Sequence, residues 1–237
     1  MRDWSPFIGL PLWVWLFVLP TGFAFLCVVC GARLRPVLRP LWAVLDRIYL
    51  GSGVIAACFM VTILALIVAQ MVARWAGISF PGSTHFAGYA MACTSFFALA
   101  YAMTRGAHIR VSIFLNMSQR VGRWLDVFAL LVSAITATYF ARYAIKTNVL
   151  SEMLNDRTQD QDKIPEWLIT FLSMFGTVPS DWGDLWAQSS GEWVYTPIWV
   201  PQIAMSMGTV LLAICMWDML YRTLIEGQNP IRAEAVE

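Results

Sequence analysis

Long apolar stretches separated by short polar segments dominate the 237-residue chain. No Asp, Glu, Lys or Arg occurs in residues 7–31, 48–73, 75–104 or 193–217, and residues 127–141 are also free of these charges. A helix needs about 20 apolar residues to cross the hydrocarbon core of a bilayer, so the first four stretches are long enough. The fifth spans only if its helix continues to about Ile145 and includes Arg142. The pattern predicts an all-α integral membrane protein.

The expected architecture is a four-helix transmembrane bundle plus one additional N-terminal hydrophobic segment. The bundle domain should occupy residues 45–225, with spans at about 48–73, 85–104, 121–147 and 197–221 and an extracytoplasmic loop at 148–195. Residues 1–44 form an extension with an extra membrane segment and a basic connector, and residues 226–237 form a cytoplasmic tail. Composition agrees, because only 13% of residues are charged, against about a quarter in soluble domains.

The N-terminal segment, residues 7–31, is interrupted by Pro11 and Pro20. A signal peptide would have a more basic start, a shorter apolar run and a small-residue cleavage site. We therefore expect a membrane segment, with a kinked and half-inserted segment as the alternative. In the connector at 33–47, Pro36 and Pro40 argue against a long regular helix.

The distribution of charge predicts which side of the membrane each loop occupies. Arginine-rich loops stay in the cytoplasm, and the segment after the second span is rich in basic residues and has no acid before Asp126. Residues 146–192 hold eight acids against three basic residues, so this region should lie outside. Within it, residues 165–175 are apolar but too short to span, which favours a short helix on the outer membrane face or on a partner.

A stripe of small residues marks one face of the second expected helix. Its members are Gly88, Ala92, Ser95, Ala98 and Ala102, at spacings of three and four. Such stripes are typical of faces where membrane helices pack, and exposure of the stripe to lipid is the alternative. Gly51 and Gly53 should likewise let another helix approach the first span. Asp218 and Arg222 stand one turn apart and can pair.

Residues that could carry chemistry are sparse. Cys27 and Cys30 have a redox or metal spacing, but no second cysteine pair or histidine is near, so two small apolar side chains are favoured. His85 and His108 fall at opposite ends of one expected helix and cannot clamp one haem or metal together. The sequence has no phosphate-binding loop and no nucleophile elbow. We expect no catalytic residue, no cofactor, no metal site and no nucleic-acid surface, and the near absence of charge in the spans argues against an ion pathway.

Residues 100–111, AYAMTRGAHIRV, resemble the signature of the small membrane subunit of TRAP (tripartite ATP-independent periplasmic) transporters, the DctQ-like family. In that signature the second main helix ends in a basic residue, followed by Gly and His-Ile-Arg-Val. The matching positions are Arg105, Gly106, His108, Ile109, Arg110 and Val111. Residues 196–208, with Pro197 and Trp199, resemble the family's opening of the last helix. The resemblance extends over about residues 45–224.

The sequence departs from the family pattern in three places. An acid commonly follows His-Ile-Arg-Val, but Ser112 stands there. An acid often opens the second helix, where this chain has His85 and Gly88. These two departures put any family ion pair at those positions in doubt. The N-terminal segment and the long outer loop look like additions, which suggests extra contacts.

The resemblance implies a non-catalytic small permease subunit of a secondary, sodium-coupled symporter in the bacterial inner membrane. Such a subunit braces a large elevator-type, DctM-like subunit, while a periplasmic solute-binding protein delivers an organic acid such as a dicarboxylate. Gly106 would permit a sharp exit from the helix. Arg105 and Arg110 would satisfy helix-end carbonyls, partner acids or lipid phosphates, or only enforce topology. The alternative functions are a membrane anchor subunit of a respiratory complex and a membrane assembly factor.

Overall fold

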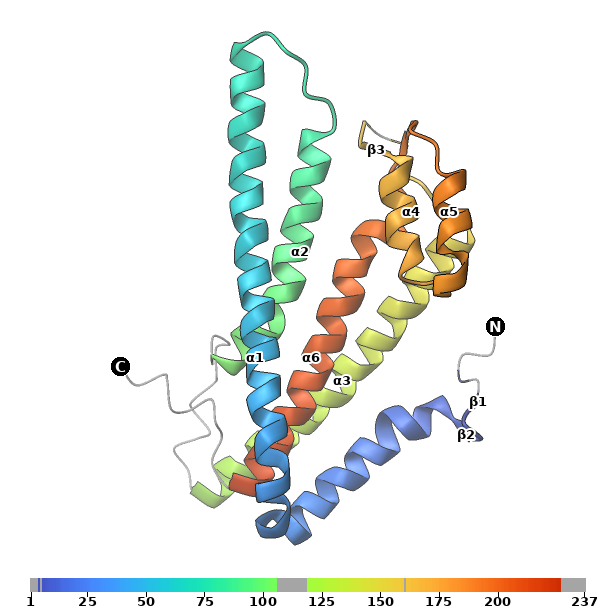
Figure 1. The fold of residues 1–237 in the computed structure, drawn as a ribbon. Coiled ribbons are helices and arrows are strands. Elements are labelled where there is room, and N and C mark those ends of the chain that lie inside the picture. The colour runs from blue at the N-terminus through green and yellow to red at the C-terminus, as the bar shows by residue number, and fades with distance from the viewer. Residues whose placement is uncertain (1–3, 5, 106–118, 160, 227–237) are drawn as a thin grey trace. The chain divides into compact units, whose positions relative to one another are not determined.

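A computed structural model describes residues 4, 6–105, 119–159 and 161–226 (Figure 1). Four long helices dominate this part of the chain: α1 (Leu19–Trp75), α2 (Ser83–Thr104), α3 (Gln119–Met153) and α6 (Trp199–Glu226). The expectation of an all-α membrane fold is confirmed. The chain divides into two compact units, of which the first comprises Met1–Val54, Phe97–Tyr143 and Gly208–Glu237 and the second Ile55–Phe96 and Ala144–Met207.

Helix α1 is far longer than the expected first span, and the prediction that Pro36 and Pro40 argue against a long regular helix at residues 33–47 is wrong. Pro36 and Pro40 lie inside the helix, whose one non-helical residue is Cys30, with φ −118° and ψ 20°. A proline removes the hydrogen bond to the carbonyl four residues earlier. Both prolines are exposed, so the carbonyl groups that they leave without a donor lie on an accessible side of the helix, where water can bind them.

The N-terminal extension packs against α6 within the first unit. Two short antiparallel strands, β1 (Pro6–Phe7) and β2 (Leu10–Pro11), precede a π-helical turn, η1 (Val14–Val18), which leads into α1. The Tyr221 hydroxyl donates to the Pro20 carbonyl over 3.2 Å, and the rings of Phe23 and Tyr221 lie 5.0 Å apart, edge to face. The extension is therefore held by specific contacts with the last helix.

One face of α3, made mostly of alanines, is buried in the core of the first unit. Leu130, Ala134, Ala137 and Ala141 are all buried at spacings of three and four, and α6 contributes the largest share of the same core. The indole N–H of Trp217 donates to the Thr138 hydroxyl over 2.9 Å and joins the two helices. Since lipid tails are as apolar as the core, close van der Waals contact is what favours helix association, and alanines permit it.

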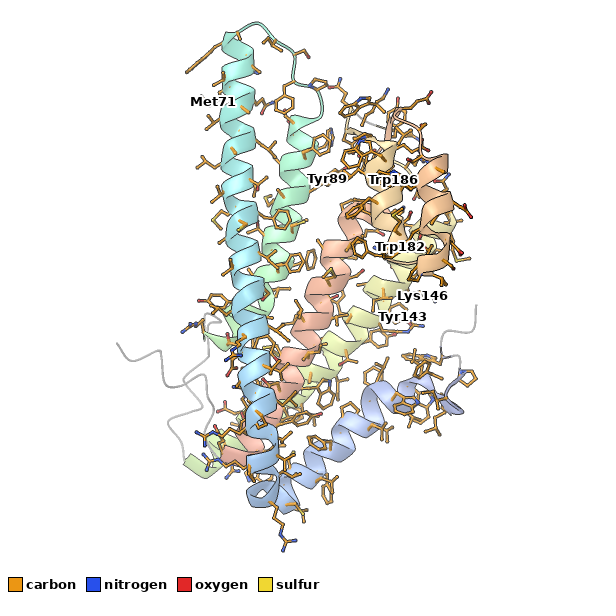
Figure 2. All side chains as sticks on the ribbon, viewed as in Figure 1. Met71, Tyr89, Tyr143, Lys146, Trp182 and Trp186 are labelled. Carbon is orange, nitrogen blue, oxygen red and sulfur yellow. The ribbon has the colours of Figure 1, made fainter. Side chains whose placement is uncertain are left out.

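Helix ends differ from the expected spans by a few residues. Helix α6 begins at Trp199, so Pro197 precedes it and only Pro201 lies in its first turn. Helix α3 continues to Met153, six residues past the expected end at 147. Tyr143 and Lys146 therefore project from within the helix rather than from its last turn (Figure 2).

The loop between α3 and α6 is a folded part of the second unit. Strand β3 (Lys163–Pro165) pairs antiparallel with β4 (Trp193–Tyr195), with Ile164 opposite Val194. Between the strands lie α4 (Glu166–Met174), a short 3₁₀ turn η3 (Pro179–Asp181) and α5 (Trp182–Gln188). The short helix expected within residues 165–175 is confirmed as α4, and it packs beside α5 (Figure 1). The strands were not expected from the sequence.

Candidate functional site

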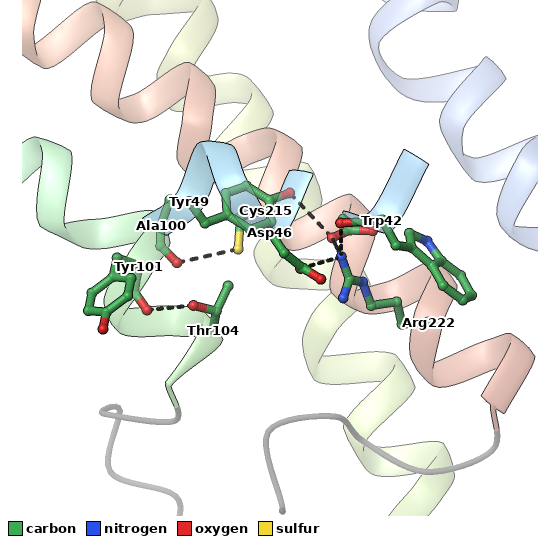
Figure 3. A network of polar contacts seen from close by, with 9 residues as sticks. Trp42, Asp46, Tyr49, Ala100, Tyr101, Thr104, Cys215 and Arg222 are labelled. Carbon is green, nitrogen blue, oxygen red and sulfur yellow. Dashed lines mark hydrogen bonds and ion pairs between the residues drawn. The ribbon is translucent and has the colours of Figure 1, made fainter. Parts of the chain in front are cut away.

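A buried ionic cluster joins α1 and α6 in the first unit (Figure 3). One guanidinium nitrogen, Nη2 of Arg222, lies 2.8 Å from Oδ2 of Asp218 and 2.7 Å from Oδ1 of Asp46. The Tyr49 hydroxyl donates to the same Asp218 oxygen over 3.3 Å. The guanidinium also lies over the Trp42 ring, 5.4 Å from its centroid. We call Trp42, Asp46, Tyr49, Asp218 and Arg222 the arginine cluster.

Burial makes this cluster energetically important. Asp218 is 4% exposed and the Arg222 side chain 12%, whereas the Asp46 side chain is 54% exposed. A buried ion pair gives little net stability relative to an apolar replacement, but removal of one partner strands the other charge in a medium of low polarity. The cluster therefore fixes which faces of α1 and α6 meet.

The predicted pairing of Asp218 with Arg222 is confirmed, but their partners on α1 were missed. Trp42, Asp46 and Tyr49 follow one another at spacings of four and three, which places them on one face of a helix. This face was not predicted, because Pro36 and Pro40 argued against a long regular helix at residues 33–47. If the helix is taken to continue through Pro36 and Pro40, the spacing of Trp42, Asp46 and Tyr49 predicts that they share one helix face.

The end of α2 carries the first residue of the family motif. The Arg105 guanidinium lies over the Tyr101 ring, 5.4 Å from its centroid, and the Thr104 hydroxyl donates to the Tyr101 carbonyl. Tyr101 in turn packs on Gly53 of α1, where an added Cβ would lie 2.7 Å from the ring. The other motif positions, Gly106, His108, Ile109, Arg110 and Val111, lie outside the described residues.

The small-residue stripe on α2 is not the face that this helix buries within the chain. Gly88 and Ser95 are exposed, and the remaining members, Ala92, Ala98 and Ala102, are half-buried. The buried positions of α2 include Ala90, Phe97 and Ala100 instead. A packing role for the stripe stays a prediction.

Pro197 and Trp199, the other two predicted motif positions, anchor the start of α6 to the folded loop. Pro197 is fully buried and bridges Arg157 in antiparallel fashion. The backbone N–H of Ile198 donates to the Asp156 carbonyl over 3.0 Å, and the Asn148 side-chain amide donates to the Trp199 carbonyl over 3.0 Å. These contacts support a structural reading of both residues.

A buried carboxylate holds the loop against α2 in the second unit. Asp162 is fully buried, its Oδ2 accepts a hydrogen bond from the Tyr89 hydroxyl, and its carbonyl accepts from the Thr196 hydroxyl. Burial alone would raise the pKa of Asp162, but hydrogen bonding outweighs it and holds that pKa below its usual value. Sequence reasoning counted Asp162 only as one of many loop acids.

A second hydrogen-bonded acid begins α4. Glu166 accepts hydrogen bonds from both the backbone N–H and the hydroxyl of Ser190, and these hold its pKa below the usual value. This contact closes the segment that contains α4 and α5, from which Trp182 and Trp186 project (Figure 2). Within the described ranges, no group of three or more His, Cys, Asp or Glu side chains could hold a metal ion.

The length and apolar character of the helices indicate the class of protein. Over the described ranges, five helical segments are long and apolar enough to cross a membrane: Val14–Gly31, Arg33–Trp75, Ser83–Thr104, Gly122–Met153 and Trp199–Glu226. The chain is a multi-pass helical membrane protein.

Residues 63–180, about half of the chain, match the model of the family described as tripartite ATP-independent periplasmic transporters, DctQ component. The chain belongs to this DctQ-like family and is a small membrane subunit of a TRAP transporter. The match includes the motif at residues 100–111 and ends before the one at 196–208. No curated protein and no solved structure matches the chain.

Proposed function

We propose that this subunit is non-catalytic and braces the large, DctM-like membrane subunit of its transporter. The large subunit couples uptake of the substrate to the movement of sodium ions down their gradient, and a periplasmic solute-binding protein delivers an organic acid. The complex lies in a bacterial inner membrane. The match of residues 63–180 to the DctQ component carries this proposal.

The distribution of charge supports a bracing role. The buried ions of the arginine cluster, Asp218 and Arg222, pair with each other on α6, and Arg222 also pairs with the half-exposed Asp46 on α1, so their charges are already used within this chain. Ion-conducting sites usually keep ionisable residues accessible to a cavity in the membrane. We assign ion and substrate binding to the partner subunit for this reason.

We further propose that the α2 stripe and the motif after α2 contact the large subunit. Gly88 and Ser95 are exposed, and small residues allow a second membrane helix to approach closely. Arg105, Arg110 and their neighbours in the motif have a structural role at the cytoplasmic end, and Pro197 and Trp199 have one at the other end of the bundle.

Purification of the tagged chain in mild detergent, followed by mass spectrometry, tests the assignment of a partner. We expect a large multi-spanning membrane protein at fixed stoichiometry. A strain that lacks only this chain should lose uptake of the transported acid. Persistent uptake in that strain, or recovery of a respiratory enzyme or of no partner, would contradict the proposal.

A further inference from the structure

The loop between α3 and α6 exposes an aromatic face on α4. Trp167, Phe171 and Phe175, the last at the C-terminal cap, follow one another at intervals of four residues and therefore lie on one side of the helix. They are 46%, 47% and 75% exposed, and the rings of Phe171 and Phe175 lie 5.4 Å apart, edge to face. Ile169 and Leu172 lie away from this face and are half-buried. Over the described ranges, the fold thus leaves the aromatic face of α4 largely uncovered.

Helix α5 packs beside α4 and exposes two tryptophans, Trp182 and Trp186, one helical turn apart (Figure 2). Asp184 stands between them in the sequence, so it lies on the opposite side of α5. Glu166, at the start of α4, accepts hydrogen bonds from Ser190 and lies outside the aromatic face. Neither of these acids interrupts the aromatic surface of its own helix.

Contacts within the second unit hold the loop near the first turns of α2 and α6. Asp162, directly before β3, accepts a hydrogen bond from Tyr89 of α2, and β4 ends at Tyr195, shortly before α6 begins at Trp199. Figure 1 shows α4 and α5 at the height of the start of α6 rather than beyond it. Because α2 and α6 are both long enough to cross a bilayer, their first turns lie near one membrane surface. Helices α4 and α5 therefore lie near that surface as well.

The exposed apolar side chains differ between the membrane helix α1 and the loop. From Ile55 to Val72 of α1, all of the large exposed apolar side chains are Ile, Leu, Val or Met. In the described part of residues 166–195, every large exposed apolar side chain except Val178 is aromatic. Trp and Tyr are enriched at membrane–water interfaces, where the ring contacts apolar groups and the polar N–H or O–H stays hydrated. The composition of the loop surface therefore fits the interface rather than the hydrocarbon core.

The charge of the segment indicates how it would bind a bilayer. Residues 164–192 contain no Lys or Arg, and their acids are Glu166, Asp181, Asp184 and Glu192. Anionic lipids give a membrane a negative surface potential, which repels an acidic segment. Attraction to anionic headgroups therefore cannot hold this segment, whereas burial of aromatic rings needs no opposite charge.

We propose that α4 and α5 form an interfacial anchor, with the aromatic faces of both helices inserted among the headgroups and upper acyl chains of a zwitterionic bilayer surface. The anchor holds the first turns of α2 and α6 at the membrane surface, through the Asp162–Tyr89 hydrogen bond and the short connection from β4 to α6. Lipid accounts for both the depth and the aromatic composition of the exposed face, whereas binding of a protein partner requires neither.

Spin labels on the full chain in phosphatidylcholine vesicles test the proposal. p-Acetylphenylalanine, to which a nitroxide is coupled, replaces Phe171 in one variant and Asp184 in the matched control, so the five native cysteines stay unmodified. We expect the label at position 171 to collide more often with oxygen, which concentrates in the bilayer, than with a water-soluble nickel chelate. The label at position 184 should show the opposite preference. Exchange of half of the phosphatidylcholine for phosphatidylglycerol should not increase the oxygen preference at position 171.

A preference for the nickel chelate at position 171 would place α4 in water and overturn the proposal. Protection of this label from both reagents, in the chain alone or only in the complex with its co-purified large subunit, would assign the face to a protein and overturn the lipid assignment. An oxygen preference that requires phosphatidylglycerol would contradict attachment through aromatic rings. Thermal unfolding of each labelled variant checks the fold, and a label at Trp167 gives the same reading if the variant at Phe171 unfolds. Failure to recover a large subunit would leave the reading in the chain alone unaffected.

Discussion

Arg222 makes more contacts than any other charged residue described above. It contacts a buried acid on its own helix, a half-exposed acid on α1 and the face of Trp42. The two acids should contribute very differently, because a buried charge cannot be rescued by water and an exposed one can. The energetic core of the cluster is the Asp218–Arg222 pair.

Replacement of Arg222 by Met should destabilise the chain by about 3–5 kcal/mol, because Asp218 is left buried without its cation. Asp46→Asn should cost at most about 1 kcal/mol, since the Asp46 side chain is half exposed. Thermal unfolding in detergent measures both. The double variant Asp218→Asn with Arg222→Met should recover much of the loss, and Arg74→Met should be neutral. A neutral Arg222→Met variant would contradict the importance assigned to the pair.

The loop acid Asp162 leads to a prediction about pH. Its pKa is lower when folded than when unfolded, so the charged form stabilises the fold at neutral pH. That stability is fully present above the unfolded pKa, about 3.9, and is lost as pH falls through the lower folded value. At pH values below the folded pKa, Asp162 should therefore no longer raise the unfolding temperature of the wild-type chain.

Asp162→Asn should lower stability by about 1 kcal/mol at pH 7, because the Tyr89 hydroxyl loses a charged acceptor. The difference from wild type should begin to shrink as pH falls below the unfolded pKa of about 3.9 and should be smallest below the lower folded pKa, where Asp162 is neutral like Asn. Unfolding temperatures between pH 7 and pH 3 measure this convergence. Asp184→Asn, at an exposed position of α5, is the matched control. A difference that stays constant with pH would argue against a charged Asp162.

At the scale of helices, close approach decides which faces pack. Gly53 of α1 lies against the Tyr101 ring, whereas Gly51, two residues earlier, has open space around it. The sequence marked both glycines as possible contact points. The structure selects Gly53, because the Tyr101 side chain fills the space beside it. The alanine face of α3 follows the same principle within the first unit.

Gly53→Ala should destabilise the chain by about 1–3 kcal/mol, because the new methyl would overlap the Tyr101 ring. Gly51→Ala should be neutral or stabilise by up to about 1 kcal/mol, because alanine favours the helix and meets no neighbour. Thermal unfolding of the two variants side by side is the measurement. Addition of Tyr101→Ala to Gly53→Ala should relieve the overlap, so the two effects should not add. Equal behaviour of the two alanine variants would refute the close contact.

At the scale of the whole molecule, the arginines after α2 are expected to set topology and subunit assembly. Arg105 is exposed at the end of its helix, and loops that lose their positive charge can be translocated. The double variant Arg105→Glu with Arg110→Glu should therefore impair membrane topology or association with the large subunit. Accessibility labelling of the loop and the yield of co-purified partner measure these outcomes.

Substrate affinity should not change selectively in that double variant, because substrate recognition is assigned to other chains. Arg74→Glu, at the far end of α1, is the control for the introduction of an acid near a helix end. Normal assembly combined with an altered substrate preference would contradict the structural role of the motif.

The sequence alone determined that the chain is helical and crosses a membrane. In lipid every backbone polar group must be satisfied within its segment, so charge-free stretches of about 20 residues leave few alternatives to a helix. It also determined the pairing of Asp218 with Arg222, because one helical turn separates them, and the short helix α4. The resemblance of residues 100–111 indicates the family from the sequence alone.

Only the tertiary structure decided which faces meet. Membrane helices are apolar all round, so periodicity cannot distinguish a packed face from one that contacts lipid, and α2 buries Ala90, Phe97 and Ala100 rather than its small-residue stripe. The contact of Asp46 with Arg222 joins residues 176 positions apart, and the β3–β4 pairing likewise joins distant segments. Local sequence patterns do not predict contacts between such distant residues, because these contacts depend on how the segments pack against one another.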